Sequence, residues 1–137
     1  MNRERALQIV LSLVGLIFIA GIYPLTIVWP SGWSWHTGHS DYLQMILGIY
    51  ATLGVFLLIA SRRPAEHRSL IAFTAWSSLV HAGIMAVQSF SSAAQHGHLL
   101  GDVSALIIVG IALILLAPQK HSEPAAAVLS PAKAHGV

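Results

Sequence analysis

The stretch ALQIVLSLVGLIFIAGIYPLTIVW, residues 6–29, decides the fold class of this chain. It contains no charged residue and exceeds the ~20 residues that a helix needs to cross a bilayer core of ~30 Å. Because lipid offers no partner for backbone N–H and C=O groups, such a run must form a helix. Three more runs of this kind follow, at residues 42–60, 69–90 and 99–117. We therefore predict an all-α, four-transmembrane-helix, up-down-up-down bundle in residues 1–118 and a flexible cytoplasmic tail in residues 119–137.

The composition leaves no room for a soluble domain. Of the 137 residues, 55% are hydrophobic and 9% are charged, whereas soluble domains carry about 25% charged residues. The chain has no cysteine, which excludes disulfides, iron–sulfur clusters and thiolate catalysis. We find no nucleophile–base set and no phosphate-binding glycine loop, and this disfavours an enzyme.

The basic residues predict the orientation in the membrane. Lys and Arg occur before the first run, between the second and third, and after the fourth, but not in residues 30–41 or 91–98. By the positive-inside rule, both termini are cytoplasmic, and we expect a multi-pass protein of a bacterial inner membrane. Because the basic residues sit where topology needs them, the net charge of +2 does not indicate a nucleic acid partner.

Several local features accompany the four runs. Pro24 should bend the first helix, and Asp41 with Gln44 resembles a capping box at the start of the second. We assign the aromatic cluster before and at that start to an interfacial belt: Trp29, Trp33, Trp35 and Tyr42. In the third run, small residues recur at intervals of three and four, which suits close helix–helix association in a membrane: Ala75, Ser78, Ala82 and Ala86.

Histidines and aspartates gather around the two connections that lack Lys and Arg. The spacings are His-x-x-His-x-Asp and His-x-His-x-x-x-Asp, and imidazole with carboxylate suits a Zn- or Cu-type transition metal. The alternative is that these histidines are surface residues and that the aspartates cap helices. The candidate metal ligands are His36, His39, Asp41, His96, His98 and Asp102.

His81 lies near the middle of the third run, where an ionisable residue indicates function by default. It could form a hydrogen bond to a neighbouring helix, with Asp102 or Gln88 as partner. It could instead be the axial ligand of a haem or chlorin, since Ser77, four residues earlier, would admit a flat macrocycle. It could also belong to a proton or quinone site.

One block of the sequence also resembles a known family. Residues 45–88, MILGIYATLGVFLLIASRRPAEHRSLIAFTAWSSLVHAGIMAVQ, and residues 98–103, HLLGDV, are similar to a family of small bacterial four-helix membrane proteins that is known only as a domain of unknown function. The resemblance implies the four-helix fold and supplies no activity. The similar segments include His81, His98 and Asp102.

These observations favour a non-catalytic accessory or scaffold subunit of a larger membrane complex. Its partners would be membrane lipids and either other membrane-protein subunits or further copies of the chain. Two alternatives stay open. One is a cofactor-binding protein, with haem or chlorin on His81 or a metal in the two connections. The other is a small transporter or channel whose pathway runs past His81.

Overall fold

A computed structural model describes residues 2–35 and 38–118, and within these residues it is helical and has no strand. Four helical segments are long and apolar enough to cross a membrane, which confirms the predicted fold class. Their bounds are Arg3–Val28, Asp41–Arg62, Pro64–Ser89 and Ala93–Leu116. Residues 119–137, for which we predict a flexible tail, lie outside the described part of the chain.

The first membrane segment is irregular near its centre. It consists of α1 (Arg3–Leu16), the π-helix η1 (Ile17–Gly21) and α2 (Ile22–Val28). Pro24 lies in α2 and has no backbone N–H, and its ring would crowd the carbonyl of Ala20 in a regular α-helix. Ala20 belongs to the π-helix η1, so the irregular turn includes the carbonyl group that the proline ring would otherwise crowd. Single π-helical turns within α-helices occur frequently at functional sites.

The first connection holds a short helix that the hydropathy pattern does not predict. This is α3 (Pro30–Trp33), with proline at its first position. The second segment, α4, follows as Asp41–Arg62. Its N-cap is Ser40, whose hydroxyl accepts a hydrogen bond from the backbone N–H of Leu43 at 3.3 Å. The expectation that Asp41 caps this helix is therefore wrong by one residue.

The third and fourth segments are also composite. A 3₁₀ turn, η2 (Pro64–His67), leads into α5 (Arg68–Ser89). The fourth segment comprises η3 (Ala93–Gln95), α6 (Gly97–Leu100) and α7 (Asp102–Leu116), so the continuous helix expected over residues 99–117 is broken at Gly101. A Cβ atom at Gly101 would overlap the carbonyl oxygen of Gly32 in α3. Glycine thus lets the two backbones meet.

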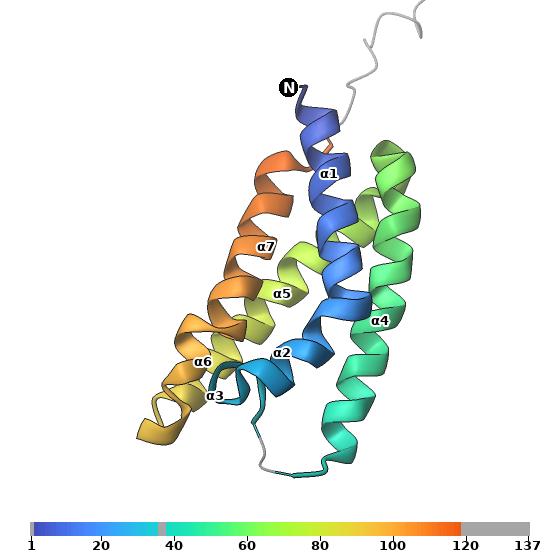
Figure 1. The fold of residues 1–137 in the computed structure, drawn as a ribbon. Helices are drawn as coiled ribbons and strands as arrows, with labels where there is room; N and C mark the ends of the chain where they lie inside the picture. The colour runs from blue at the N-terminus through green and yellow to red at the C-terminus, as the bar shows by residue number, and fades with distance from the viewer. Residues whose placement is uncertain (1, 36–37, 119–137) are drawn as a thin grey trace, which may run out of the picture.

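The bundle consists of two closely packed helix pairs, α1 with α4 and α5 with α7 (Figure 1). Gly15 and Gly54 meet where α1 crosses α4, and a Cβ on Gly54 would lie 2.6 Å from the Gly15 carbonyl oxygen. The small residues of α5 face inward, and Ala75 and Ala82 are fully buried. The small-residue face that we predicted for association therefore packs largely inside the chain.

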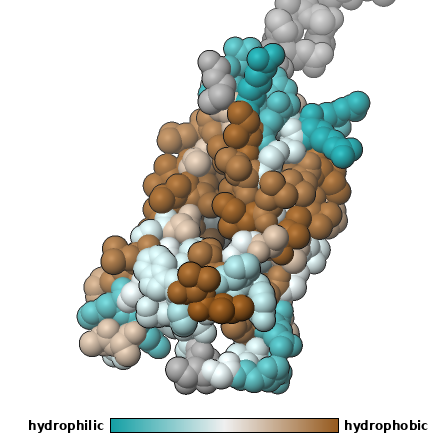
Figure 2. Space-filling view, viewed as in Figure 1, coloured by the Kyte–Doolittle hydropathy of each residue, from teal (hydrophilic) through white to brown (hydrophobic). Residues whose placement is uncertain are grey.

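The two ends of the bundle differ in charge. The N-terminus, the turn between α4 and α5 and the end of α7 lie together, and we call this the arginine end (Figure 1). There Arg3 donates a hydrogen bond to the carbonyl oxygen of Leu115 at 2.7 Å, and Arg63 pairs with Glu66 at 3.3 Å. We call the opposite end, with α3 and α6, the loop end. A hydrophobic band separates the two (Figure 2).

Candidate functional site

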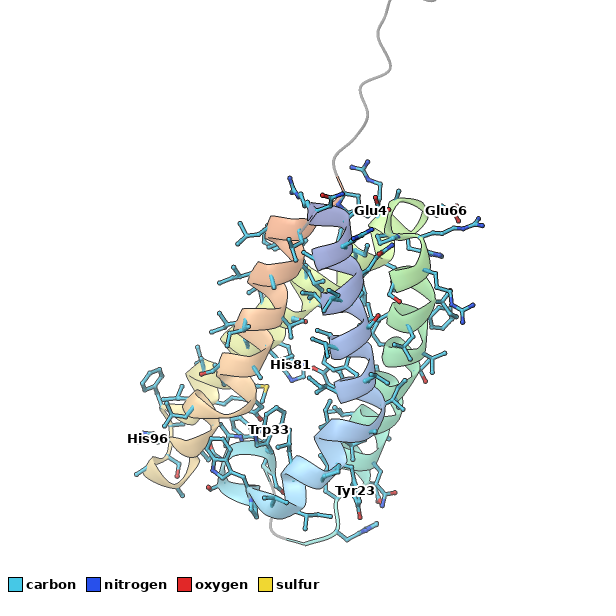
Figure 3. The ribbon with its side chains drawn as sticks, turned by 45° about the horizontal axis from the view of Figure 1, so that its top comes forward. Glu4, Tyr23, Trp33, Glu66, His81 and His96 are labelled. Carbon is cyan, nitrogen blue, oxygen red and sulfur yellow. The ribbon has the colours of Figure 1, made fainter. Side chains whose placement is uncertain are left out.

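A cavity of about 310 Å³ lies among the four membrane segments, in the half of the bundle toward the loop end. Its walls are mainly apolar, and the π-helical turn contributes Ile17 and Phe18. Figure 3 shows His81 inside the bundle, between α5 and α1. The polar and aromatic residues that line the cavity are Phe18, Trp33, Trp35, Ser40, Tyr42, Tyr50, His81, Gln88 and Asp102. A largely apolar pocket with few polar groups is the usual form of a small-molecule site.

The first polar centre of the cavity joins α4 to α5. The hydroxyl of Tyr50 and Nδ1 of His81 lie 3.1 Å apart, within hydrogen-bond distance. The rings of Phe18 and Tyr50 form a T-shaped pair, with centroids 4.8 Å apart. The first of the three alternatives for His81, an interhelical hydrogen bond, is present, but its partner is Tyr50 and not Asp102 or Gln88. Because Tyr50 engages Nδ1, the imidazole is oriented and Nε2 is not used by this bond.

The second polar centre is Asp102, at the first position of α7. Its Oδ2 accepts a hydrogen bond from Nε1–H of Trp35 at 3.0 Å and lies 3.0 Å from Nδ1 of His98. Trp35 also stacks on His98. His98 is 2% exposed and Asp102 is 7% exposed, so this is a buried network rather than a surface contact. Through its hydrogen bond with Trp35, Asp102 joins the first connection to the fourth membrane segment.

The other carboxylate oxygen of Asp102 is the exceptional atom of the site. Oδ1 is buried and accepts no hydrogen bond of standard geometry among the described residues, although the backbone N–H of the neighbouring Val103 acts on the same carboxyl group. Leaving a buried acceptor unpaired costs about 1–3 kcal/mol, and more when the group is charged. Such an atom in a folded protein calls for an explanation, and an ordered water or an ion is one of the standard ones.

A second, more polar hollow of about 770 Å³ lies at the loop end beside the cavity. Its lining includes His39, Gln95 and His98. Trp35 and Leu43 line both spaces and form part of the wall between them. The hydrogen bond between His98 and Asp102 thus connects a residue of the loop-end hollow to a residue of the cavity.

The remaining predicted site residues are dispersed. Ser77 bonds to the carbonyl oxygen of Thr74 and is not one of the described residues that line the cavity. His39 pairs with Asp41 at 3.0 Å on the surface. His96 lies next to the ring of Phe90 at the tip of the loop end (Figure 3).

The metal hypothesis stays a prediction. Within residues 2–35 and 38–118, no three His, Asp or Glu side chains form a group that could hold a metal ion. Of the predicted ligands, His98 and Asp102 are brought together, and His39 and Asp41 form a separate pair. His36 lies outside the described residues.

Two residues of the candidate site are not predicted from the sequence, Tyr50 and Trp35. Tyr50 has the appearance of an ordinary aromatic residue in an apolar run, and its partner lies 31 positions away. Trp35 was assigned to the interfacial belt, but its indole reaches inward to Asp102, 67 positions away. The sequence offers one signal for them: ionisable residues in apolar runs are rare and need hydrogen-bond partners within the membrane.

Comparison with known proteins adds two findings. The chain is 37% identical over 82 residues to Ferric-chelate reductase 1 from Bos taurus, a match that covers 58% of this chain and 13% of the reductase. The chain thus spans a small part of that relative's length. No solved structure matches it significantly. A family model matches residues 2–127, so the chain belongs to the family of unknown function DUF6632.

Proposed function

We propose that this membrane protein binds a lipophilic, redox-active ring molecule in its internal cavity and serves in membrane electron transfer. The observation that carries the proposal is the cavity itself, which has apolar walls and two polar centres, His81–Tyr50 and Asp102. Ionisable residues at membrane depth are costly and are retained mainly where they act on a substrate, ion or cofactor.

The volume of the cavity favours a single ring system. At about 310 Å³ it lies at the lower end of the ~300–1,000 Å³ range of ligand pockets. A benzoquinone-sized headgroup matches this size, and its hydrocarbon tail would extend into lipid. A haem or chlorin on Nε2 of His81 is the second candidate, because Tyr50 would orient the imidazole as the outer-shell partners of metal-bound histidines do. The macrocycle would require the helix pairs to separate further.

The relative's name supports a redox role. Ferric-chelate reductase is, by its name, an enzyme that passes electrons to ferric chelates, and the similarity covers more than half of this chain. A membrane bundle with this cavity fits a component that holds or hands over a lipophilic electron carrier.

The accessory-subunit hypothesis is compatible with this role and stays a prediction. Its structural support is weaker than the sequence indicates, because Ala75 and Ala82 are buried inside the chain rather than presented to a partner. A transport pathway past His81 also stays a prediction. We further propose that the arginine end faces the cytoplasm of a bacterial cell, as the positive-inside rule indicates.

The test is to purify the protein gently and to identify what it carries. We would record the absorption spectrum, extract the small molecules for mass spectrometry and identify co-purifying chains. The matched variants are Ala105→Phe, which places a ring in the cavity, and Ala72→Phe, which adds the same ring on an exposed face of α5. We expect a quinone-type molecule or a pigment in the wild type and in Ala72→Phe, and a loss of it in Ala105→Phe.

Each other outcome has a definite meaning. Equal small-molecule content in wild type and Ala105→Phe would contradict binding in the cavity. A protein that carries only bulk lipid but arrives with other subunits would favour the accessory role without a ligand. A Soret band that disappears in His81→Ala would select the macrocycle over the single ring.

A further inference from the structure

The cavity has a rim on the outer surface of the bundle. We propose that its ligand enters sideways from the bilayer, through a mouth between α4 and α5 at the loop end. The ligand class is then a ring molecule dissolved in lipid, and not a water-soluble one that enters through the loop-end hollow. This inference rests on the proposed function above and specifies how the ligand of that cavity arrives.

The mouth is marked by residues that belong both to the cavity wall and to the outer surface. On α4, Tyr42 and Ile46 line the cavity and are 79% and 41% exposed. On α5, Gln88 lines the cavity and is also exposed. Residues with both properties on two neighbouring helices indicate the rim of an opening. Because α4 and α5 belong to membrane segments, this rim opens toward the bilayer.

The helix geometry agrees with an opening at this place. α4 and α5 meet at the arginine end, where η2 joins them, and they separate toward the loop end (Figure 1 and Figure 3). Tyr42, Ile46 and Tyr50 recur at intervals of four residues, so they lie on one face of α4. His81 and Gln88 lie seven residues apart on one face of α5. The hydrogen bond of 3.1 Å between Tyr50 and His81 bridges the two helices and forms the inner edge of the mouth.

The rim lies near the headgroup level of the bilayer. Tyr42 is the second residue of α4, and Gln88 is the last but one of α5. Both helices have 22 residues, which is close to the length of a membrane span, so their loop-end termini lie near the membrane surface. Tyrosine is enriched at this level, where its ring meets apolar chains and its hydroxyl meets water. A ring headgroup with a hydrocarbon tail can reach such a mouth without leaving the bilayer.

The side of the cavity toward the loop-end hollow is held closed. Trp35 lines both spaces, and its indole is fixed by the hydrogen bond to Asp102 at 3.0 Å and by the stack on His98. A ligand that came from the hollow would have to displace this indole and break both contacts. Tyr42 and Gln88 are exposed, and exposed side chains change rotamer within nanoseconds. The lateral route therefore requires the smaller rearrangement.

Ile17 marks the alternative place for a mouth. It lies in η1, lines the cavity and is 47% exposed. The residues of α7 that line the cavity are buried or half-buried, so the first and fourth segments do not both contribute an exposed lining residue. This is why the observations favour the opening between α4 and α5.

The experiment blocks the rim at one position at a time in the full chain, which has no native cysteine. Gln88→Cys is modified with a bulky maleimide in lipid nanodiscs and mixed rapidly with a short-tailed benzoquinone, and tryptophan quenching follows binding. The matched control is Val87→Cys, which is 71% exposed on α5 and is not among the described residues that line the cavity. Ile17→Cys tests the alternative mouth. A sulfonated benzoquinone, which dissolves in water but not in lipid, tests the route through the hollow.

We expect modified Gln88→Cys to bind and release the short-tailed benzoquinone roughly tenfold more slowly than modified Val87→Cys, because access to a binding site limits both rates. The affinity should change little, since a blocked mouth slows entry and exit alike. The sulfonated probe should not bind the wild type.

Equal rates in modified Gln88→Cys and modified Val87→Cys would overturn the proposal, as would a decrease confined to Ile17→Cys. Binding of the sulfonated probe as fast as the lipid-soluble one would overturn the lateral route. If the short-tailed benzoquinone shows no saturable binding to the unmodified wild type, the proposed function fails as well. Saturable binding with unchanged rates refutes only the route of entry.

Discussion

Trp35 stacks on His98, with ring centroids 4.0 Å apart and ring planes inclined by 23°. The same indole donates its N–H to Asp102, to which His98 is also hydrogen-bonded. One side chain from the first connection therefore covers and orients a buried histidine–aspartate pair of the fourth membrane segment. Trp35 also lines both the cavity and the loop-end hollow, so it forms part of the wall between them.

The indole N–H of Trp35 should contribute measurably to stability. Trp35→Phe keeps an aromatic ring against His98 but removes the donor to Asp102. The loss of a hydrogen bond to a charged group should lower the free energy of unfolding by roughly 1.5–3 kcal/mol. Thermal unfolding in detergent checks this, with Trp76→Phe on an exposed face of α5 as the control. Equal melting of the two variants would show that the hydrogen bond is not formed.

Gly101 should tolerate no side chain. In Gly101→Ala, the new Cβ meets the carbonyl oxygen of Gly32, so α3 must move away from the fourth segment. Overpacking of this kind costs about 1–3 kcal/mol. Gly48→Ala is the control, because its Cβ meets nothing within 4 Å, and the better helix former should stabilise by up to about 1 kcal/mol. Denaturant titrations would measure the free energy of unfolding of both variants. Equal values for Gly101→Ala and Gly48→Ala would contradict the close packing of α3 on Gly101.

The hydroxyl of Tyr50 should support ligand binding through His81. Tyr50→Phe removes a hydrogen bond worth about 0.5–1.5 kcal/mol and frees the imidazole to turn. We expect the affinity for a short-tailed hydroquinone to fall by roughly two- to tenfold. Tyr23→Phe, at an exposed position of α2, is the matched control. A normal affinity in Tyr50→Phe would show that His81 does not contact the ligand.

The absence of native cysteine allows a direct test of orientation. Ser92 is exposed at the loop end, and Ala65 is exposed at the arginine end. In intact spheroplasts, a membrane-impermeant maleimide should label Ser92→Cys at once and label Ala65→Cys only after permeabilisation. The reverse pattern would place the arginine end outside and contradict the orientation proposed from the basic residues.

Hydropathy predicted the four membrane segments because the polar backbone of an apolar run finds no hydrogen-bond partner in lipid and pairs with itself in a helix. It could not predict the break at Gly101, since that break depends on the approach of Gly32 from a segment 69 positions earlier in the chain. The N-cap was misplaced by one residue because Ser40 and Asp41 are both good capping residues.

The site was predictable only in part. His81, His98 and Asp102 stood out as ionisable residues within or beside apolar runs. Their partners did not, because aromatic residues such as Tyr50 and Trp35 are common in membrane proteins for their apolar surface alone. The i, i+4 spacing of His98 and Asp102 suits a metal pair and a hydrogen-bonded pair equally well, and the distance to Trp35 favours the second.

The most direct test of ring binding is a titration of the wild-type protein in nanodiscs with a short-tailed benzoquinone. Trp33 and Trp35 line the cavity, so their fluorescence reports a quinone bound there. We predict saturable quenching with one ligand per chain, lost in Ala105→Phe and retained in Ala72→Phe. Quenching that rises linearly without saturation, or that is identical in the two variants, would contradict a binding site between the helix pairs.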